Sequence, residues 1–353
     1  KNEKNSSRYR EIEVTGSPLE MGRQTGEAAR EEIAGFCELA LDRLREMLDV
    51  SSEQARAHAE HCLPYAEQYS SDSVAELHGI AEAADIPFWK IMLLQIRNQF
   101  TPDADAGCTS LSLPATSTRG PIVAQNWDND PALDPFTIVL TRRPVGKPAL
   151  MTVTQAGLIS YVGFNDAGIG ACLNSLPAPS RPTGVPHYFT LRELYESTSL
   201  EAAVQAIRRA ERAIPANIML MTPEGPADLE VTLETVQVLR PVETGWITHT
   251  NHCLHPELCE YNEQFPELIG SYPRKARIDS LLQAYGDEIS VDDIKAALTD
   301  HEGYPRSLCR HVNDDADTGY WQTVFSVIIE PEQMRMQVSR GTPCSAGYEL
   351  YQL

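Results

Sequence analysis

The residue best placed to do chemistry in this sequence is a cysteine at the start of a predicted strand. Cys108 follows a flexible glycine, Gly107, where a helical block gives way to the alternating pattern Cys-Thr-Ser-Leu-Ser-Leu. A thiol attacks an amide or acyl carbonyl once a base takes its proton. Cysteine is also among the most buried residue types, so Cys108 taken alone is more often an inert core thiol.

Two further polar residues are candidates to assist such a thiol. Asp128 lies in the run Asn-Trp-Asp-Asn-Asp, and Asn251 lies between two histidines in His-Thr-Asn-His-Cys. Asp and Asn side chains bond their own backbone, so from the residues alone Asp128 is better explained as a turn former. Asn251 is equally consistent with a structural amide at a strand end.

A run of histidines and cysteines offers chemistry of another class. Imidazole and thiolate groups, the ligands that zinc prefers, lie close together at His249, His252, Cys253, His255 and Cys259. The standard ligand spacings are absent, and in a strand the first two histidines face opposite sides. A zinc-binding or non-catalytic protein is therefore the alternative, and the main interpretation uses no metal and no cofactor.

Composition excludes several partners. The net charge of −21, from 29 basic and 50 acidic residues among 353, repels phosphate backbones and anionic lipid headgroups. No stretch approaches the roughly 20 apolar residues of a membrane span, and the first ten residues are polar. The eight cysteines form no CxxC pair, which favours reduced, buried thiols. We expect a soluble, cytoplasmic protein with no nucleic-acid and no membrane partner.

The first hundred residues predict helices. Ser17 to Glu20 form a capping box with proline at the first helical position, and helical spacing continues to about residue 48. Another helical pattern follows Pro64, and the segment from Phe88 to Ile96 is apolar nearly all round. That last helix should be buried.

Beyond residue 105 the sequence predicts strands between Gly and Pro turns. They begin with Cys108 and continue at 121–127, 136–141, 150–155, 169–174, 217–221, 229–239, 246–250, 323–329 and 334–339. Helical patterns interrupt them at 189–211, 273–284 and 291–299. Because strands and helices are grouped rather than alternating, we predict one α+β domain with antiparallel sheets over residues 1–353.

A set of short motifs runs along nearly the whole chain in a fixed order. The motifs are Gly16-Ser17-Pro18, Met21-Gly22, Gly79-Ile80-Ala81, Gly107-Cys108-Thr109, Gln125-Asn126-Trp127-Asp128, Gly163-Phe164-Asn165 with Gly168, Arg181-Pro182-Thr183-Gly184-Val185-Pro186 and His249-Thr250-Asn251-His252-Cys253. In order and spacing, this set resembles the penicillin acyltransferase family (acyl-coenzyme A:6-aminopenicillanic acid acyltransferases, peptidase family C45) of N-terminal nucleophile (Ntn) hydrolases.

The resemblance implies a four-layer αββα sandwich made as an inactive precursor. Cys108 would attack the Gly107 carbonyl, and water would then release a helical chain, 1–107, and a catalytic chain, 108–353, which stay together as a heterodimer. The α-amine freed at Cys108, with a pKa of about 7.7 to 8.0, would accept the proton of its own thiol, whose usual pKa is about 8.5. By resemblance, Asn251 supplies an oxyanion donor, and Asp128 orients the amine or assists cleavage.

The expected substrate is an N-acyl or peptide-like small molecule, hydrolysed through a thioester at Cys108. The alternative within the family is an acyl-coenzyme A-dependent acyltransferase that uses the same thioester. Net charge disfavours so anionic a donor, unless basic runs at 208–209 or 274–277 offset it. The motif at 319–322 lacks the arginine found in the fungal penicillin-forming enzyme. Aromatic residues that the sequence offers as pocket walls are Tyr161, Phe164, Tyr188, Tyr320 and Trp321.

Overall fold

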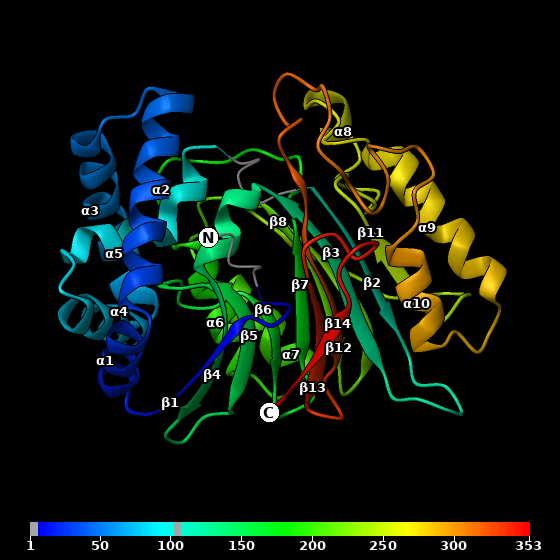
Figure 1. Ribbon diagram of the computed structural model, residues 1–353, viewed down its shortest axis with the longest axis horizontal. Helices are drawn as coiled ribbons and strands as arrows, with labels where there is room; N and C mark the ends of the chain where they lie inside the picture. Colours follow the sequence, from blue (N-terminus) through cyan, green and yellow to red (C-terminus); the bar gives the residue numbers. More distant parts are fainter. Residues whose placement is uncertain (1–5, 102–106) are drawn as a thin grey trace.

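Two β-sheets packed face to face form the centre of the molecule, and helices cover both outer faces (Figure 1). The computed structural model describes residues 6–101 and 107–353. The first sheet has eight strands in the order β1-β4-β5-β6-β7-β8-β9-β10, and the second has six in the order β11-β2-β3-β12-β13-β14. The predicted four-layer αββα arrangement is confirmed.

The strands of the eight-stranded sheet are short and mostly buried. Their bounds are β1 Arg10–Gly16, β4 Thr137–Pro144, β5 Leu150–Gln155, β6 Val162–Asn165, β7 Gly170–Asn174, β8 Ala216–Thr222, β9 Gly225–Val231 and β10 Val236–Leu239. Those of the six-stranded sheet are β2 Gly107–Leu113, β3 Ile122–Asn129, β11 Ile247–His249, β12 Gln322–Glu330, β13 Arg335–Arg340 and β14 Tyr348–Gln352.

Two groups of helices cover the sheets. Against the eight-stranded sheet lie α1 Pro18–Ala28, α2 Arg30–Leu48, α3 Ser52–Tyr69, α4 Ser71–Ala84, α5 Phe88–Ile96, α6 His187–Tyr195 and α7 Leu200–Arg208. Beyond the six-stranded sheet lie α8 Tyr261–Gln264, α9 Ser271–Tyr285 and α10 Val291–Leu298. The predicted capping box at Ser17 and Glu20 is present.

Two apolar clusters hold these layers together. The larger one joins the first helical group to both sheets and includes Cys108, Trp127 and Phe325. The smaller one joins α9 and α10 to the six-stranded sheet through residues such as Ile278 and Ile328. Burial of apolar surface in both clusters is the main force that fixes the six-stranded sheet between its two neighbours.

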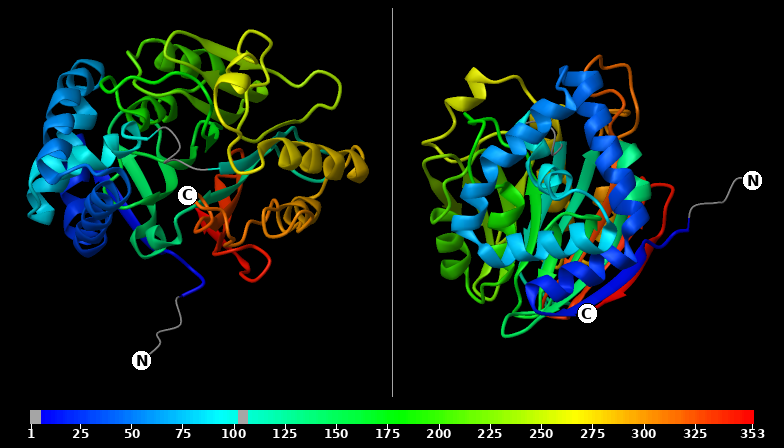
Figure 2. Two further views of the ribbon diagram at one scale, coloured as in Figure 1. Left: turned by 90° about the horizontal axis from the view of Figure 1, so that it is seen from above. Right: turned by 90° about the vertical axis from the view of Figure 1, so that its left-hand side faces the viewer.

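The structure adds features that the sequence patterns did not predict. Strand β1 pairs with β4 in parallel over seven positions, so the eight-stranded sheet is antiparallel except at this edge. The predicted long helix is interrupted at Ala29, and α3, which the sequence patterns did not predict, includes Pro64 and ends at Tyr69. The N-terminal segment also lies beside the last strand (Figure 2). The backbone N–H of Tyr9 donates to the Tyr351 hydroxyl over 2.8 Å.

Within residues 6–101 and 107–353, no helix combines the length and the apolar character that crossing a membrane requires.

Candidate active site

Cys108 is the second residue of β2 and is fully buried. Strand β2 pairs with β3 so that Cys108 lies opposite Trp127 and Gly107 lies opposite Asp128. The Trp127 ring stacks on Phe325 with 4.9 Å between centroids, and its Nε1–H donates to the Tyr161 hydroxyl. The thiol therefore belongs to a strand that is paired on both sides, with β11 and with β3. Asp105 and Ala106, which precede it, lie outside the described residues.

The bond before Cys108 lies in a crowded place that only glycine fits without rearrangement. A Cβ atom on Gly107 would overlap the Ile269 side chain. Ile269 itself has a φ of 42°, a left-handed conformation that is costly for a β-branched residue. Backbone strain is thus stored next to the Gly107-Cys108 bond.

Asp128 is buried beside the thiol and has an unusual pKa. Burial raises the pKa of its carboxyl to about 7, although the charges of Arg274 and Arg310 and a hydrogen bond from Thr323 oppose the rise. The Thr323 hydroxyl donates to Asp128 Oδ1 over 2.7 Å, whereas Oδ2 has no partner among the described residues. A half-ionised carboxylate with a free oxygen is suited to accept a proton near neutral pH.

Asn251 contacts Cys108 directly. Its Oδ1 accepts the backbone N–H of Cys108 over 2.9 Å, and its Nδ2 donates to the carbonyl oxygen of Ser175. In this arrangement the oxygen of the amide faces the nitrogen that would become the free amine. The oxyanion role stays a prediction.

Arg274 is one of two residues of the site that the sequence patterns missed. Its guanidinium is buried and donates to the Cys108 carbonyl oxygen over 2.7 Å, to Asn251 Oδ1 over 2.7 Å and to Thr109 Oγ1 over 3.1 Å. In the sequence, Arg274 stands out only as part of the basic run 274–277. The residues around Arg274 in the sequence do not indicate that it is buried, because its burial depends on how the whole of α9 packs.

A second missed residue, Asn174, joins the two sheets beneath the thiol. It ends β7, and its Nδ2 donates to the carbonyl oxygens of Cys108, His249 and Thr250 over 3.0–3.3 Å. Its Oδ1 accepts the hydroxyl of Ser110. The carbonyl groups at the start of β2 and at the end of β11 are therefore held by one amide.

Glu230 supports the loop that carries Asn251. It accepts hydrogen bonds from the backbone N–H groups of Leu254 and His255, and from His249 Nε2 over 2.7 Å. Although burial favours the neutral acid, these hydrogen bonds keep the pKa of Glu230 below its usual range. Burial also raises the pKa of the adjacent Asp228 to about 7.

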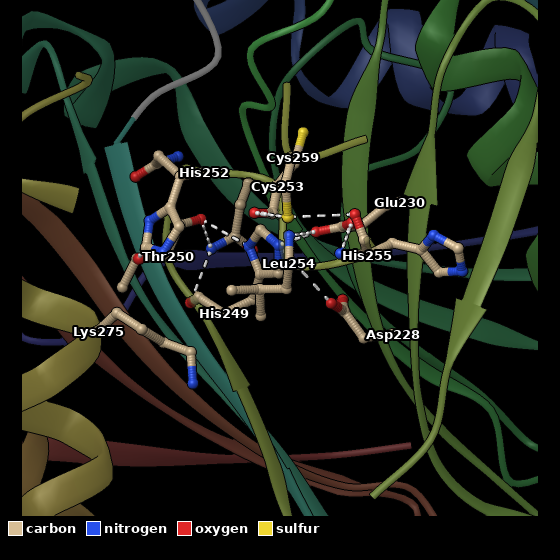
Figure 3. Close-up of polar contacts among 12 residues, drawn as sticks. Asp228, Glu230, His249, Thr250, His252, Cys253, Leu254, His255, Cys259 and Lys275 are labelled. Atoms are coloured by element: carbon tan, nitrogen blue, oxygen red, sulfur yellow. Dashed lines mark hydrogen bonds and ion pairs between the residues drawn. The ribbon is translucent and has the colours of Figure 1, made fainter. Parts of the chain in front are cut away.

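The zinc hypothesis for residues 249–259 is wrong. Figure 3 shows the His249 ring directed toward Glu230 and Asp228, with the His255 ring pointing away from them. Among the described residues, the metal-ligand atoms that gather around His249 are those two carboxylates, with no atom of His252, Cys253, His255 or Cys259. His252 instead bonds Ser271 and stacks on Tyr272. Closeness in sequence did not bring these side chains together.

In the intact chain the Cys108 thiol is held in its neutral form. Burial raises its pKa well above the usual value, and the nearby charge of Asp128 raises it further. Its backbone nitrogen is an amide in this state and cannot take the proton. A base other than the Cys108 nitrogen is therefore needed for any attack by the intact chain, and Asp128 is the ionisable carboxyl next to it.

The predicted pocket aromatics divide into two groups. Tyr161, Phe164 and Tyr188 are fully buried in the core. Tyr320 and Trp321 line a cleft of about 630 Å³ between α2 and the segment 316–321. The cleft reaches residues 129 and 130, directly after Asp128, and its walls are largely apolar side chains of α2 with two arginines. Such a cleft suits a ligand with an apolar portion and a polar group.

Comparison with known proteins identifies a family and relatives, including one that aligns over nearly the whole chain. The family model described as acyl-coenzyme A:6-aminopenicillanic acid acyl-transferase matches residues 116–344. The 40 kDa form of the acyl-coenzyme A:6-aminopenicillanic-acid-acyltransferase of Emericella nidulans is 29% identical over 346 residues, which cover 94% of this chain and 92% of that protein.

Solved structures with a related arrangement are more distant. The Caenorhabditis elegans orthologue of N-acylethanolamine-hydrolyzing acid amidase is 17% identical, with a TM-score of 0.45, over 64% of this chain and 93% of its own. A mutant of the conjugated bile acid hydrolase of Clostridium perfringens is 13% identical, with a TM-score of 0.45, over 70% and 97% of the two chains. At these values the likeness says nothing about substrate.

Proposed function

Because this chain belongs to the acyl-coenzyme A:6-aminopenicillanic acid acyl-transferase family, we propose that it is a self-cleaving amide hydrolase with Cys108 as its nucleophile. The family predicted from the sequence motifs is confirmed. The observation that carries the proposal is the packing of Asp128, Asn251 and Arg274 around a cysteine near the start of β2. These groups supply a base, an amine contact and a cation at one thiol.

The first proposed step is cleavage of the chain. Asp128 takes the thiol proton, and Sγ of Cys108 attacks the Gly107 carbonyl carbon. The C–N bond breaks as the S–C bond forms, and the proton passes to the leaving nitrogen. Water then hydrolyses the thioester, which yields a carboxylate at Gly107 and restores the thiol. Strain at Ile269, next to this bond, supports the proposal.

The second proposed step is turnover of an external amide. The new α-amine of Cys108 replaces Asp128 as the base, because its pKa lies near neutrality. Asn251 Oδ1 already faces this nitrogen and would orient it. Attack on the substrate carbonyl forms an acyl thioester and releases an amine, and water then releases the acid. The cleft that includes Tyr320 and Trp321 is proposed to hold the apolar part of the substrate.

An acyltransferase is the second candidate, which the name of the full-length relative favours. In that case an amine, instead of water, takes the acyl group from the thioester. The basic run at 274–277 offers little free charge to a coenzyme A donor: Arg274 is buried, and Arg277 pairs with Asp300 over 2.6 Å. We therefore retain hydrolysis of an N-acyl or peptide-like small molecule as the main proposal.

We also propose a cytoplasmic location. All eight cysteines carry free thiols in the structure, as expected in a reducing compartment.

Denaturing mass spectrometry of freshly made protein tests the proposal. We expect the 39.1 kDa chain to convert into two fragments, 1–107 and 108–353. Turnover of a panel of N-acyl amines and N-acyl amino acids, with hydroxylamine added to trap the thioester, then separates hydrolase from acyltransferase. An active protein with an unbroken backbone through position 108 contradicts the mechanism.

A further inference from the structure

Four side chains of the types that ligate metals lie close together in two loops next to the six-stranded sheet, although they are far apart in sequence. His301, Cys309 and His311 lie between α10 and β12, and Cys344 lies between β13 and β14. Their ligand atoms all lie within 4.8 Å of one another. We call these four residues the loop cluster.

The distances from His311 Nε2 to the other three members of the loop cluster are close to those of tetrahedral coordination. His311 Nε2 lies 3.2 Å from His301 Nε2, 3.6 Å from Cys309 Sγ and 3.5 Å from Cys344 Sγ. Zinc bonds of about 2.0–2.1 Å to nitrogen and about 2.3 Å to sulfur, arranged tetrahedrally, place ligand atoms roughly 3.3–3.8 Å apart. The observed separations are close to that range.

Hydrogen bonding alone does not account for the geometry. His311 Nε2 would need three partners at once, yet a ring nitrogen offers either one proton or one lone pair. A cation at the centre of the four atoms satisfies every ligand simultaneously. Two thiolates and two neutral imidazoles also neutralise a divalent ion, so the site carries no net charge.

Backbone contacts hold the ligands independently of a metal. The N–H of Cys309 donates to the Asp300 carbonyl oxygen over 3.2 Å, and the N–H of His311 donates to the Pro305 carbonyl oxygen over 2.9 Å. The hydroxyl of Ser307 donates to the Cys309 carbonyl oxygen over 2.6 Å. This support, together with buried Cys309, indicates a preformed site.

We propose that the loop cluster binds one Zn²⁺ ion as a closed structural site with two cysteine and two histidine ligands. The main interpretation of the sequence expected no metal, and these four residues, spread from 301 to 344, were not among the ligands that it considered. The ion would join the segment before β12 to the loop before β14. With four protein ligands it leaves no position open for substrate or water, so its role is structural.

The site also bears on the segment beside Asp128. Cys309 is followed by Arg310, whose backbone N–H donates to Thr323 Oγ1 over 2.9 Å and whose carbonyl oxygen accepts the N–H of Thr323. The Thr323 hydroxyl in turn donates to Asp128. Zinc would therefore fix a segment that is two hydrogen bonds away from the proposed base of cleavage.

Metal analysis of the purified full-length protein tests this proposal. Zinc is measured by plasma mass spectrometry after dialysis into metal-free buffer, in the wild type, His311→Ala, Cys344→Ser and the control Cys259→Ser. Cys259 is a matched control because it is also an exposed free cysteine in a loop. We expect one equivalent of zinc in the wild type and the control, and at least about tenfold less in the two ligand variants.

Cobalt substitution gives a second readout that needs no variant. Wild type loaded with Co²⁺ should show strong visible bands and a near-ultraviolet sulfur-to-metal band, which tetrahedral thiolate coordination produces. Wild type that takes up neither Zn²⁺ nor Co²⁺ on titration overturns the proposal. So does zinc retained in full by both ligand variants, or recovery of Cys309 and Cys344 as a disulfide in unreduced peptide maps.

Discussion

Cys108 and Cys309 are both fully buried thiols, yet their surroundings differ in kind. Burial raises the pKa of both, to about 12 for Cys309 and well above the usual value for Cys108. Around Cys108 lie groups that move protons or hold backbone atoms, whereas around Cys309 lie ligands for a soft metal. Burial alone thus does not distinguish a nucleophile from a metal ligand; the neighbouring side chains do.

The largest expected effect separates the two thiols directly. Cys108→Ala should leave the chain intact and abolish turnover, because no other group can form the thioester. Cys309→Ala and Cys172→Ala, which also remove buried thiols, should still be cleaved at position 108. Denaturing mass spectrometry and a turnover assay measure both properties. Cleavage or normal turnover by Cys108→Ala would show that Cys108 is not the nucleophile, and the two thiols would then not differ in function as proposed.

The next largest effect concerns the base. Asp128→Asn should slow self-cleavage by roughly 10²–10⁴-fold, the usual contribution of a positioned base. Because the pKa of Asp128 is about 7, cleavage of the wild type should speed up as pH rises through neutrality and then level off. Time courses from pH 5 to 9 measure this, with Asp134→Asn as the control. A pH-independent rate contradicts the assignment.

The carboxyl group of Asp128 should lower the free energy of unfolding at high pH. Its folded-state pKa is raised from 3.8 to about 7, so its contribution to stability is full at low pH and is lost as pH rises through about 7. In the uncleaved Cys108→Ala background, adding Asp128→Asn should therefore increase the free energy of unfolding more at pH 8 than at pH 5. Urea unfolding of the two proteins compares them; equal differences at both pH values argue against a buried charge.

Substitutions of Asn251 test which function its amide has at the Cys108 site. If its amide is the oxyanion donor, Asn251→Ala and Asn251→Asp should both lose about 10²–10³ in kcat. The aspartate keeps an acceptor for the Cys108 nitrogen but lacks the donor. Steady-state kinetics on cleaved protein distinguishes these functions. Full activity of Asn251→Asp would restrict Asn251 to orienting the amine.

A smaller effect is expected for Glu230, which holds the loop that carries Asn251. Glu230→Gln should slow self-cleavage about tenfold and lower the free energy of unfolding by roughly 1–3 kcal/mol, because the loop 249–255 loses charge-assisted hydrogen bonds. The exposed Glu234→Gln is the control. Cleavage rates and urea unfolding measure the change. If Glu230→Gln behaves like the control, the loop is held in some other way.

The smallest effect on chemistry belongs to the loop cluster. A strong chelator should lower the melting temperature of the wild type by several degrees and leave that of Cys344→Ser unchanged, while cleavage at Cys108 still completes. Differential scanning calorimetry with and without chelator measures this. Complete loss of cleavage on metal removal would mean that the two cysteine sites are not separate in function.

Local patterns predicted much of the fold but only part of the site. The helix Phe88–Ile96 and the strand Leu150–Gln155 have the predicted bounds, because their apolar patterns and flanking turns are unambiguous. Strand β1 was not predicted although residues 11–15 alternate, because Ile12 and Val14 are its only buried residues and the segment around it is polar.

Within the site, the family motifs singled out Cys108, Asp128 and Asn251, and these three residues lie close together in the structure. Arg274 and Asn174 were missed, because their contacts depend on how α9 and β7 pack against β2, and no local pattern encodes that packing. The zinc hypothesis failed for the same reason, since it took neighbours in sequence for neighbours in space.

The parallel pairing of β1 with β4 has a consequence for the mature protein. Once the proposed cut is made, the smaller fragment still supplies the border strand of a sheet that otherwise belongs to the larger one, in register over seven positions. Dilution should therefore not part the fragments short of denaturation. Removal of the smaller fragment would expose β4 as an unpaired edge strand, which favours aggregation. Synthesis of both fragments as one precursor avoids that exposure.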